Sequence, residues 1–256
     1  MNKKTTSPIP DIAEALAEQI FSEQIKVGEW LPREIDLCDQ FKVSRATVRS
    51  ALHTLVNKCI VKRISGTGTV VRQMSDWMLL DPKVLGWMTN YGRSIERFET
   101  EMFSFRVAIE PFVTSLAAQN ATASDLTKIE DAFEGMNAAS KQVDLMWKGR
   151  SHNDYDVAFH EAIFEATNSL IWAQLSHLLR PSITYIVEKS NMSADELQDS
   201  MERHRQVMEC IRLRKPEAAY QAAIRVLDRT GQDLGVKEQN LLSPHLLLAS
   251  SIKNST

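Results

Sequence analysis

Cysteine, glycine and proline are all scarce in this chain, and each shortage excludes a class of protein. The three cysteines, Cys38, Cys59 and Cys210, are odd in number and form no CxxC pair, which excludes a disulfide framework or a zinc ribbon. Nine glycines and eight prolines in 256 residues leave little room for a loop-rich all-β fold. The hydrophobic content of 43% and charged content of 25% are ordinary for a globular protein.

Long apolar runs are missing as well. No run approaches the roughly 18 apolar residues that a membrane helix needs. Asp11, Glu14 and Glu18 interrupt the stretch in which a signal peptide would have its apolar core. We therefore expect a cytoplasmic protein without a membrane partner.

Negative charge is absent from one long stretch of this acidic chain. Residues 42–72, KVSRATVRSALHTLVNKCIVKRISGTGTVVR, hold seven Lys or Arg and no Asp or Glu, whereas the whole chain has a net charge of −3. Residues 1–75 carry +3 and the remainder −6. This asymmetry predicts a small basic domain joined to a larger acidic one, with different partners.

The spacing around the basic stretch predicts helices followed by a hairpin. Residues 11–25 place apolar side chains four apart, a second helix starts near Pro32, and Ser44 is a natural N-cap for a third helix. Residues 59–64 are rich in β-branched side chains, the turn 65–68 contains two glycines, and 69–73 form the returning strand. This order is that of a winged helix-turn-helix.

The third helix has one apolar and one basic face. Its buried stripe is predicted at Val48, Leu52 and Leu55. The opposite face carries two guanidiniums, small residues and no carboxylate, at Arg45, Ala46, Arg49, Ser50 and His53. Arginine bonds guanine edges and phosphate oxygens, so this face is typical of a surface that reads DNA. The plainer alternative is a solvated charged face.

Residues 31–71 closely resemble the DNA-binding domain of GntR-family transcription regulators, and the resemblance covers about residues 10–73. The shared pattern is LP-x-E-x-x-L, then F-x-VSR-x-TVR-x-AL-x-x-L, then G-x-GT-x-V. The resemblance implies that Arg45 and Arg49 read bases and that the remaining contacts come from Arg33, Ser44, Thr47 and Gly66, the last at the wing tip. Two departures are Lys58-Cys59, where the family often has glycine, and Ala46, where a polar residue is usual.

The acidic remainder is predicted to be an all-α bundle of six or seven helices. A helical run starts at Pro82, and further helices are expected at about 94–120, 123–139, 151–167, 169–190, 194–213 and 216–236. The fold class is therefore mainly α. The expected domains are a flexible start (1–9), the winged helix-turn-helix (10–74), a linker (75–82), a helical effector-binding and dimerisation domain (83–238) and a tail (239–256).

Three polar groupings interrupt the otherwise apolar helices of the bundle. Asp156 and His160 lie one helical turn apart, His204 projects from a later helix, and Arg106 is one turn from Glu110. An Asp/His pair at this spacing either binds a divalent metal or forms a hydrogen-bonded couple. A cation on a core-forming helix needs an anion, supplied by Glu110 or by a ligand.

These helices resemble the FCD effector domain of the FadR branch of the family, over about residues 82–236. The resemblance implies a zinc-type divalent metal held by an Asp and three His, which binds the carboxylate of a small organic acid. Asp156, His160 and His204 match, but the third His is expected near position 227, where this chain has Leu227. Asp228 would point about 100° away around the helix. We therefore favour a metal-poor pocket, in which Arg106, His160 and His204 bind the acid directly.

A narrower resemblance concerns the linker. DWMLLDPKVLGWM, residues 76–88, is similar to the linker of galactonate-operon repressors, which also lack the last His. It implies a sugar acid of the hexonate type as effector. We thus expect a homodimeric repressor of a sugar-acid catabolic operon, bound to a pseudo-palindromic DNA operator and released when a small carboxylate binds between Arg106, Asp156, His160 and His204.

Two other functions are compatible with parts of this sequence. The helical domain would serve dimerisation alone if Arg106 and His204 were merely paired inside the bundle. A metal-dependent enzyme is disfavoured because the sequence has no HExxH, no GxSxG, no phosphate-binding glycine loop and no nucleophile beside a base. We therefore expect a protein that is not an enzyme.

Overall fold

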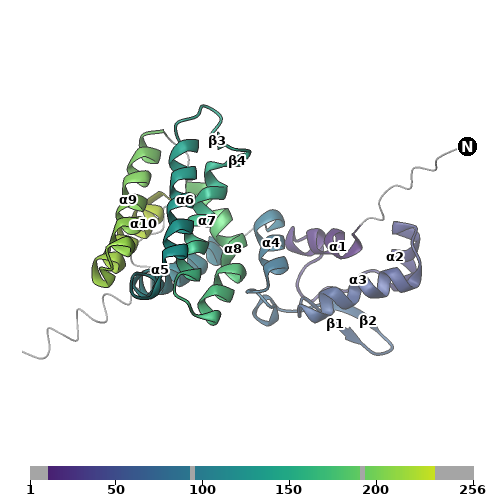
Figure 1. The fold of residues 1–256 in the computed structure, drawn as a ribbon. Coiled ribbons are helices and arrows are strands. Elements are labelled where there is room, and N and C mark those ends of the chain that lie inside the picture. The colour runs from purple at the N-terminus through teal and green to yellow at the C-terminus, as the bar shows by residue number, and fades with distance from the viewer. Residues whose placement is uncertain (1–10, 93–95, 191–193, 234–256) are drawn as a thin grey trace, which may run out of the picture. The chain divides into compact units, whose positions relative to one another are not determined.

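The computed structural model describes residues 11–92, 96–190 and 194–233. The chain divides into two compact units, Met1–Ile95 and Glu96–Thr256. Figure 1 draws their helices and strands. The expected N-terminal segment 1–9 and the tail 239–256 lie outside the described residues, as do the last three residues of the helix expected at 216–236.

The first unit is a winged helix-turn-helix followed by one more helix. Its elements are α1 (Ile12–Phe21), α2 (Glu34–Phe41), α3 (Arg45–Asn57), β1 (Val61–Ile64), β2 (Gly68–Val71), the short 3-10 helix η1 (Met74–Asp76) and α4 (Pro82–Tyr91). Strands β1 and β2 pair in antiparallel register from Val61↔Val71 to Ile64↔Gly68. This confirms the fold expected from the spacing.

Local hydrogen bonds account for where the first helices begin. The Ser44 hydroxyl accepts a bond of 3.3 Å from the Thr47 backbone N–H, so Ser44 caps α3 as expected. Helix α2 starts at Glu34 and not at Pro32, because Arg33 is extended and its N–H donates to the Asp36 carboxylate at 3.2 Å. Lys42, with φ of 53°, makes the turn between the two helices.

The predicted apolar stripes form the core of this unit. Ile12, Leu16 and Ile20 of α1 are buried, and the stripe of α3 is buried too, at Val48, Leu52 and Leu55. Each buried side chain of this size stabilises the folded state by about 1.5–3 kcal/mol compared with the same side chain left exposed. The two stripes therefore fix how α1 and α3 pack.

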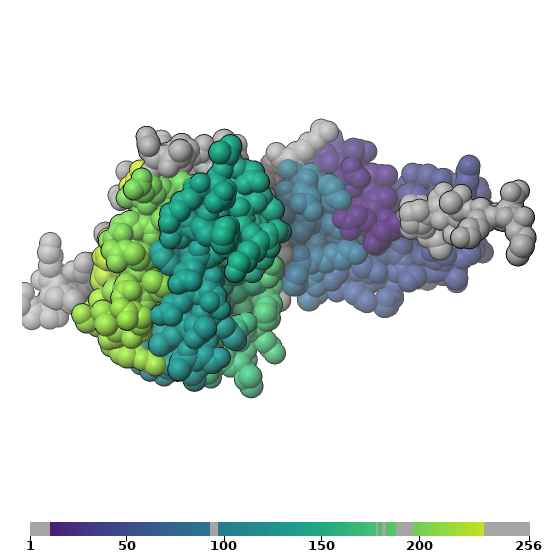
Figure 2. Space-filling view, turned by 45° about the horizontal axis from the view of Figure 1, so that its top comes forward, coloured from purple at the N-terminus to yellow at the C-terminus, as the bar shows by residue number. Residues whose placement is uncertain are grey.

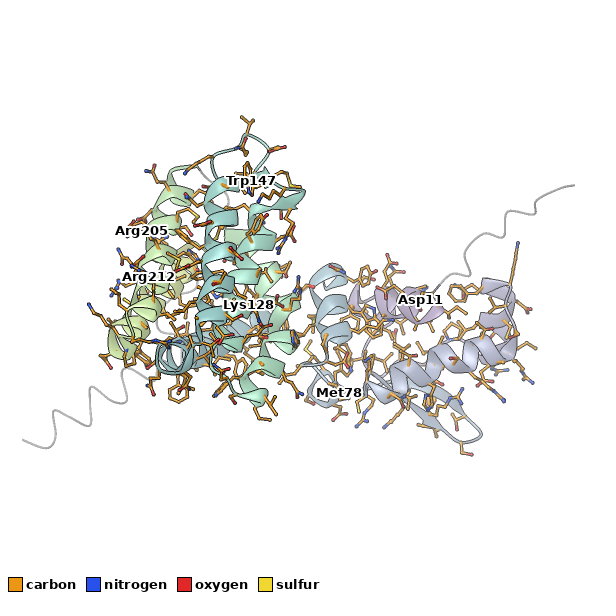
Figure 3. The ribbon with its side chains drawn as sticks, viewed as in Figure 1. Asp11, Met78, Lys128, Trp147, Arg205 and Arg212 are labelled. Carbon is orange, nitrogen blue, oxygen red and sulfur yellow. The ribbon has the colours of Figure 1, made fainter. Side chains whose placement is uncertain are left out.

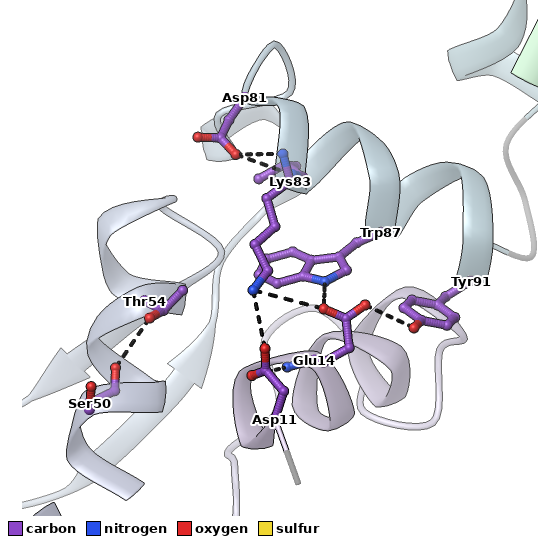
Figure 4. Close-up of polar contacts among 9 residues, drawn as sticks. Asp11, Glu14, Ser50, Thr54, Asp81, Lys83, Trp87 and Tyr91 are labelled. Carbon is purple, nitrogen blue, oxygen red and sulfur yellow. Dashed lines mark hydrogen bonds and ion pairs between the residues drawn. The ribbon is translucent and has the colours of Figure 1, made fainter. Parts of the chain in front are cut away.

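Helix α4 packs against α1 in the first unit. The carboxylate of Glu14 on α1 accepts hydrogen bonds from the indole of Trp87 at 2.8 Å and from the hydroxyl of Tyr91 at 2.9 Å (Figure 4). Lys83 approaches the same carboxylate at 3.9 Å. The sequence predicted that α4 begins the helical domain. Its packing on α1 instead places it in the first unit, which also contains α3.

The second unit is a helical bundle. In its described residues it contains α5 (Glu96–Asn120), α6 (Ala123–Ala139), α7 (His152–Glu165), α8 (Leu170–Ser190), α9 (Ala194–Arg212) and α10 (Pro216–Asp233). Helix α5 packs on α10, α6 on α7, α7 on α8, and α9 on α10. Figure 2 shows α6 beside α9 on one face of this unit. The expected breaks at 120–122 and Asn168 are confirmed, with Thr122 capping α6 and Asn168 at φ of 53°.

A short hairpin between α6 and α7 was not expected. Its strands are β3 (Met146–Trp147) and β4 (Arg150–Ser151), and Trp147 lies at this hairpin in Figure 3. Lys148 and Gly149 connect them with positive φ of 47° and 76°, the backbone twist that suits a two-residue hairpin loop. Strands of two residues are too short to show alternation, so the sequence carries no strand signal here.

None of the helices in the described parts of the chain is long and apolar enough to cross a membrane.

Candidate functional site

The basic face of α3 is exposed. Arg45, Ala46, Arg49, Ser50 and His53 all lie at the surface, on the side of the helix opposite its buried stripe. The Ser44 and Thr47 hydroxyls are 2.9 Å apart at the start of the helix. The face that the spacing predicted is therefore available to a large partner.

A groove of about 830 Å³ lies between the starts of α2 and α3 and the hairpin. Three of the predicted DNA-binding residues line it, namely Arg33, Arg45 and Gly66, whereas Ser44, Thr47 and Arg49 lie outside it. Gly66 has φ of +73° and open space around it, as the tip of a tight turn requires.

A carboxylate sits among these cations, and sequence reasoning missed it. Glu34 at the start of α2 accepts from Arg49 Nε at 2.9 Å and pairs through its other oxygen with Arg63 of the hairpin. The hydrogen bond from Arg49 is the main reason that the pKa of Glu34 is lowered. Residues 42–72 lack acids, but the helix-turn-helix brings an acid from the preceding helix to their surface. The known packing of the two helices of a helix-turn-helix was therefore the signal that could have placed Glu34 beside Arg49.

The second site is a buried ionic cluster that begins on α5. Arg106 and Glu110 are 2% and 4% exposed. Their side chains form a forked pair, with Nε–Oε1 of 2.5 Å and Nη2–Oε2 of 3.3 Å. The remaining nitrogen, Arg106 Nη1, is buried without a hydrogen-bond partner. Arg106 is therefore largely neutralised by Glu110, one of the two outcomes considered from the sequence.

His160 on α7 links this pair to Asp156. Its Nδ1 is 3.3 Å from Glu110 Oε2 and its Nε2 is 3.3 Å from Asp156 Oδ1. Burial alone would lower the pKa of His160, but the two carboxylates outweigh burial and raise it to about 9. Burial would likewise raise the pKa of Glu110, yet Arg106 and His160 lower it to about 2.

His204 on α9 approaches the same oxygen of Asp156. Its Nδ1 is 2.8 Å from the Ser200 carbonyl oxygen, which only accepts, so this nitrogen carries the hydrogen. Its Nε2 faces Asp156 Oδ1 at 3.5 Å, and both atoms are buried without a hydrogen-bond partner. Asp156 Oδ1 is thus approached by Nε2 of both histidines, at 3.3 Å from His160 and 3.5 Å from His204, which is the arrangement of donor atoms around a shared cation.

The donor atoms fit a divalent metal ion. Ligand atoms of Asp156, His160 and His204 lie within 4.8 Å of one another. Glu110 at His160 Nδ1 and the Ser200 carbonyl at His204 Nδ1 are the outer partners that orient imidazole ligands of metals. Two imidazoles and a carboxylate suit a zinc-type ion and leave coordination positions open.

Helix α10 supplies no ligand to this set. Leu227 packs in an apolar cluster with Phe103, Val107 and Ile186. The α10 residues that line the cavity beside His160 and His204 are Ala223 and Val226. The ligand that the resemblance placed near position 227 is therefore replaced by aliphatic side chains.

The cavity at this cluster is small. Its volume is about 20 Å³, enough for about one water molecule. Its walls combine four polar side chains with an apolar remainder, from Glu110, Thr114, Phe159, His160, Ile163, His204, Val207, Ala223 and Val226. An organic acid would need the helices around it to move apart.

Comparison with known proteins matches both units. Residues 8–71 match the model of bacterial regulatory proteins of the gntR family, and residues 101–229 match the FCD domain. The galactonate operon transcriptional repressor of Escherichia coli K12 is 27% identical over 213 residues, 83% of this chain and 90% of that protein. The Glc operon transcriptional activator of the same strain is 24% identical over 90% of this chain and 91% of its own length.

A solved structure has the same fold. It is the Lar protein, which controls the agr system of Listeria monocytogenes, with a TM-score of 0.59 and 18% identity over 92% of this chain and 100% of that chain. The matched domains and these relatives are transcription regulators and not enzymes.

Proposed function

Since this chain belongs to the gntR family of bacterial regulatory proteins and carries an FCD domain, we propose that it represses a sugar-acid catabolic operon and leaves its operator when a small carboxylate binds. A transcription regulator of this type binds DNA through its first unit and an effector through its second. The proposal of a carboxylate effector is supported by the buried Arg106–Glu110–His160–Asp156–His204 cluster. The proposal of a sugar-acid operon is supported by the similarity of most of this chain to a galactonate repressor.

The DNA-binding part of the proposal rests on the exposed face of α3. Residues 44–57 would enter the major groove, where Arg45 and Arg49 reach base edges. Arg33, Ser44, Thr47 and Gly66 would contact the phosphate backbone. A protein that acts on chromosomal DNA would work in the cytoplasm.

A homodimer is proposed because a pseudo-palindromic operator needs two symmetric heads. An exposed apolar patch on α5 and α8 supports a contact between copies of the second unit. Leu170 and Ile171 are 84% and 73% exposed, and beside them Phe112 packs edge-on against Trp172 with 6.0 Å between the ring centroids. Apolar side chains this exposed favour association.

The charge of the buried cluster supports an anionic effector. With His160 protonated, the two cations Arg106 and His160 balance the two anions Glu110 and Asp156. A divalent metal ion held by Asp156, His160 and His204 would displace the proton of His160 and leave one net positive charge. When bound, that ion would supply an electrophilic position for a carboxylate oxygen. Arg106 Nη1, buried without a partner, is a second donor for the same carboxylate.

A hexonate is the proposed effector, because a relative that matches 83% of this chain is a galactonate operon repressor. The Glc operon activator among the relatives makes activation the alternative outcome on DNA, which promoter geometry decides. The other alternative is that the second unit only dimerises, with the cluster as a structural ion network.

Release from DNA would follow from opening the cavity. A space of about 20 Å³ does not admit an organic acid, so the acid would bind a conformation in which the helices around it have shifted. A tenfold loss of operator affinity requires about 1.4 kcal/mol of coupling between the two sites.

A thermal-shift screen of sugar acids, with and without a chelator, tests the proposal. A hexonate that raises the melting temperature only without chelator supports a metal ion held by Asp156, His160 and His204. Stabilisation that persists with chelator supports direct binding by Arg106 and the histidines. If no acid changes the melting temperature, the second unit is a dimerisation module.

A further inference from the structure

His152, the first residue of α7, is a buried imidazole that the cluster described above does not use. It is 1% exposed, and its ring nitrogens make no hydrogen bond of normal geometry, although the side chain of Asn153 interacts with the ring. Leaving a polar group in this condition costs about 1–3 kcal/mol. A phenylalanine at this position would avoid the cost of burying two ring nitrogens, so the presence of a histidine here suggests a function for those nitrogens.

The position of His152 on α7 relates it to the metal ligands. His152, Asp156 and His160 follow one another at intervals of four residues, so they lie on one face of the helix in successive turns. Asp156 and the His204 ring of α9 are both close enough to act on the His152 ring electrostatically. Burial dominates and lowers the pKa of His152, which keeps the ring in the neutral form that ligates metals.

The group formed by Asp156, His160 and His204 does not include His152, whose ring would have to turn toward a metal ion to bind it. Asp156, His160 and His204 provide three donor atoms. The residues of α10 that face the cavity are Ala223 and Val226, and Leu227 is in an apolar cluster. A fourth ligand must therefore come from another element or from a small molecule.

We infer that His152 is a fourth protein ligand of a divalent metal ion held by Asp156, His160 and His204, in place of the side chain that α10 does not supply. The inference rests on the metal-binding part of the proposed function. A set of three imidazoles and one carboxylate suits Zn²⁺, Ni²⁺ or Co²⁺. Three ligands then come from consecutive turns of α7, and His204 closes the set from α9.

The test compares Zn²⁺ binding by the full-length protein and by His152→Phe, using competition with a chromophoric chelator. The variant keeps the size of the ring and removes both nitrogens. We expect Zn²⁺ affinity to fall about tenfold or more. In the presence of excess chelator, the variant should be at least as stable as the parent, because it no longer buries two ring nitrogens. His177→Phe, at an exposed histidine of α8, is the control and should leave affinity unchanged.

Co²⁺ binding gives a second measurement, since its visible spectrum depends on the number and kind of ligands. The spectrum should change in His152→Phe and in His152→Gln, and the glutamine variant serves if phenylalanine fails to fold. Unchanged Zn²⁺ affinity and an unchanged Co²⁺ spectrum in both variants would overturn the inference while leaving the three-ligand site intact. A parent protein that binds neither ion would overturn both the inference and the metal-binding part of the proposed function.

Discussion

At the scale of single residues, Arg49 is the clearest test of DNA recognition. It is exposed on α3 and forms an ion pair of 2.9 Å with Glu34 of α2. Arg49→Ala should weaken operator binding by about 1–3 kcal/mol and relax the preference for one base pair. Fluorescence anisotropy with the operator and with single-base variants measures both effects. Arg205→Ala, on the outer side of α9 (Figure 3), is the control. If Arg49→Ala lowers affinity equally for the operator and for every single-base variant, Arg49 contacts phosphate and not a base.

Arg106 must be tested together with Glu110. Arg106→Ala would leave a buried carboxylate with His160 as its main remaining cation, and breaking a buried pair in this way costs about 3–5 kcal/mol. Urea unfolding should therefore show a large loss for Arg106→Ala and recovery of most of it for Arg106→Met with Glu110→Gln. The double variant should still bind operator but no longer release it with effector. If the double variant still releases the operator when effector is added, Arg106 does not belong to the effector site.

At the scale of elements, the packing of α6 on α7 depends on a glycine. A Cβ at Gly135 would lie 2.1 Å from Cε1 of Tyr155, whose ring is held by a hydroxyl bond to the Trp147 carbonyl and by Arg150 stacked at 4.5 Å. Gly135→Ala should destabilise the protein by about 1–3 kcal/mol, as overpacking does. Gly86→Ala in α4, where a Cβ meets nothing within 4 Å, should stabilise it by about 0.5–1 kcal/mol. Equal effects in urea unfolding would contradict this reading of the two sites.

The junction between α1 and α4 depends on one carboxylate. Glu14→Ala would leave the indole of Trp87 and the hydroxyl of Tyr91 without their acceptor and should cost about 1–3 kcal/mol. Urea unfolding followed by tryptophan fluorescence measures the loss. Glu18→Ala, at an exposed position of the same helix, should change the free energy of unfolding by less than about 0.5 kcal/mol. If Glu18→Ala lowers the free energy of unfolding as much as Glu14→Ala does, the negative charge of the helix and not the hydrogen bonds of Glu14 stabilises the junction.

The helices were predictable because their signals are local and repeated. The stripe Val48, Leu52 and Leu55 and the cap Ser44 recur in the structure as the spacing predicted. The β3–β4 hairpin was not predictable, since two-residue strands carry no period. Cys59 was recognised as a departure from a usual glycine, but only the structure gives the reason. Its φ is 59°, a conformation that costs a side chain about 1–2 kcal/mol.

The buried cluster was predictable in its members and not in its connections. The spacing of Asp156 and His160 puts them in adjacent turns of any helix, so their contact follows from sequence alone. The bond between His160 and Glu110 joins α7 to α5, and no local pattern encodes that packing. For the same reason the sequence did not reveal Glu34 between Arg49 and Arg63.

At the scale of the whole molecule, the two sites must influence each other equally in both directions. If a saturating hexonate lowers operator affinity tenfold, saturating operator must lower hexonate affinity tenfold, because one coupling free energy of about 1.4 kcal/mol governs both. Isothermal titration of the effector into free protein and into the protein–operator complex measures the second factor, and anisotropy measures the first. Nonspecific DNA of the same length is the control and should leave effector affinity unchanged. Effector affinity that is identical with and without operator would mean that binding in the second unit has no effect on α3. The acid would then be a bound structural group, and release from DNA would need another signal.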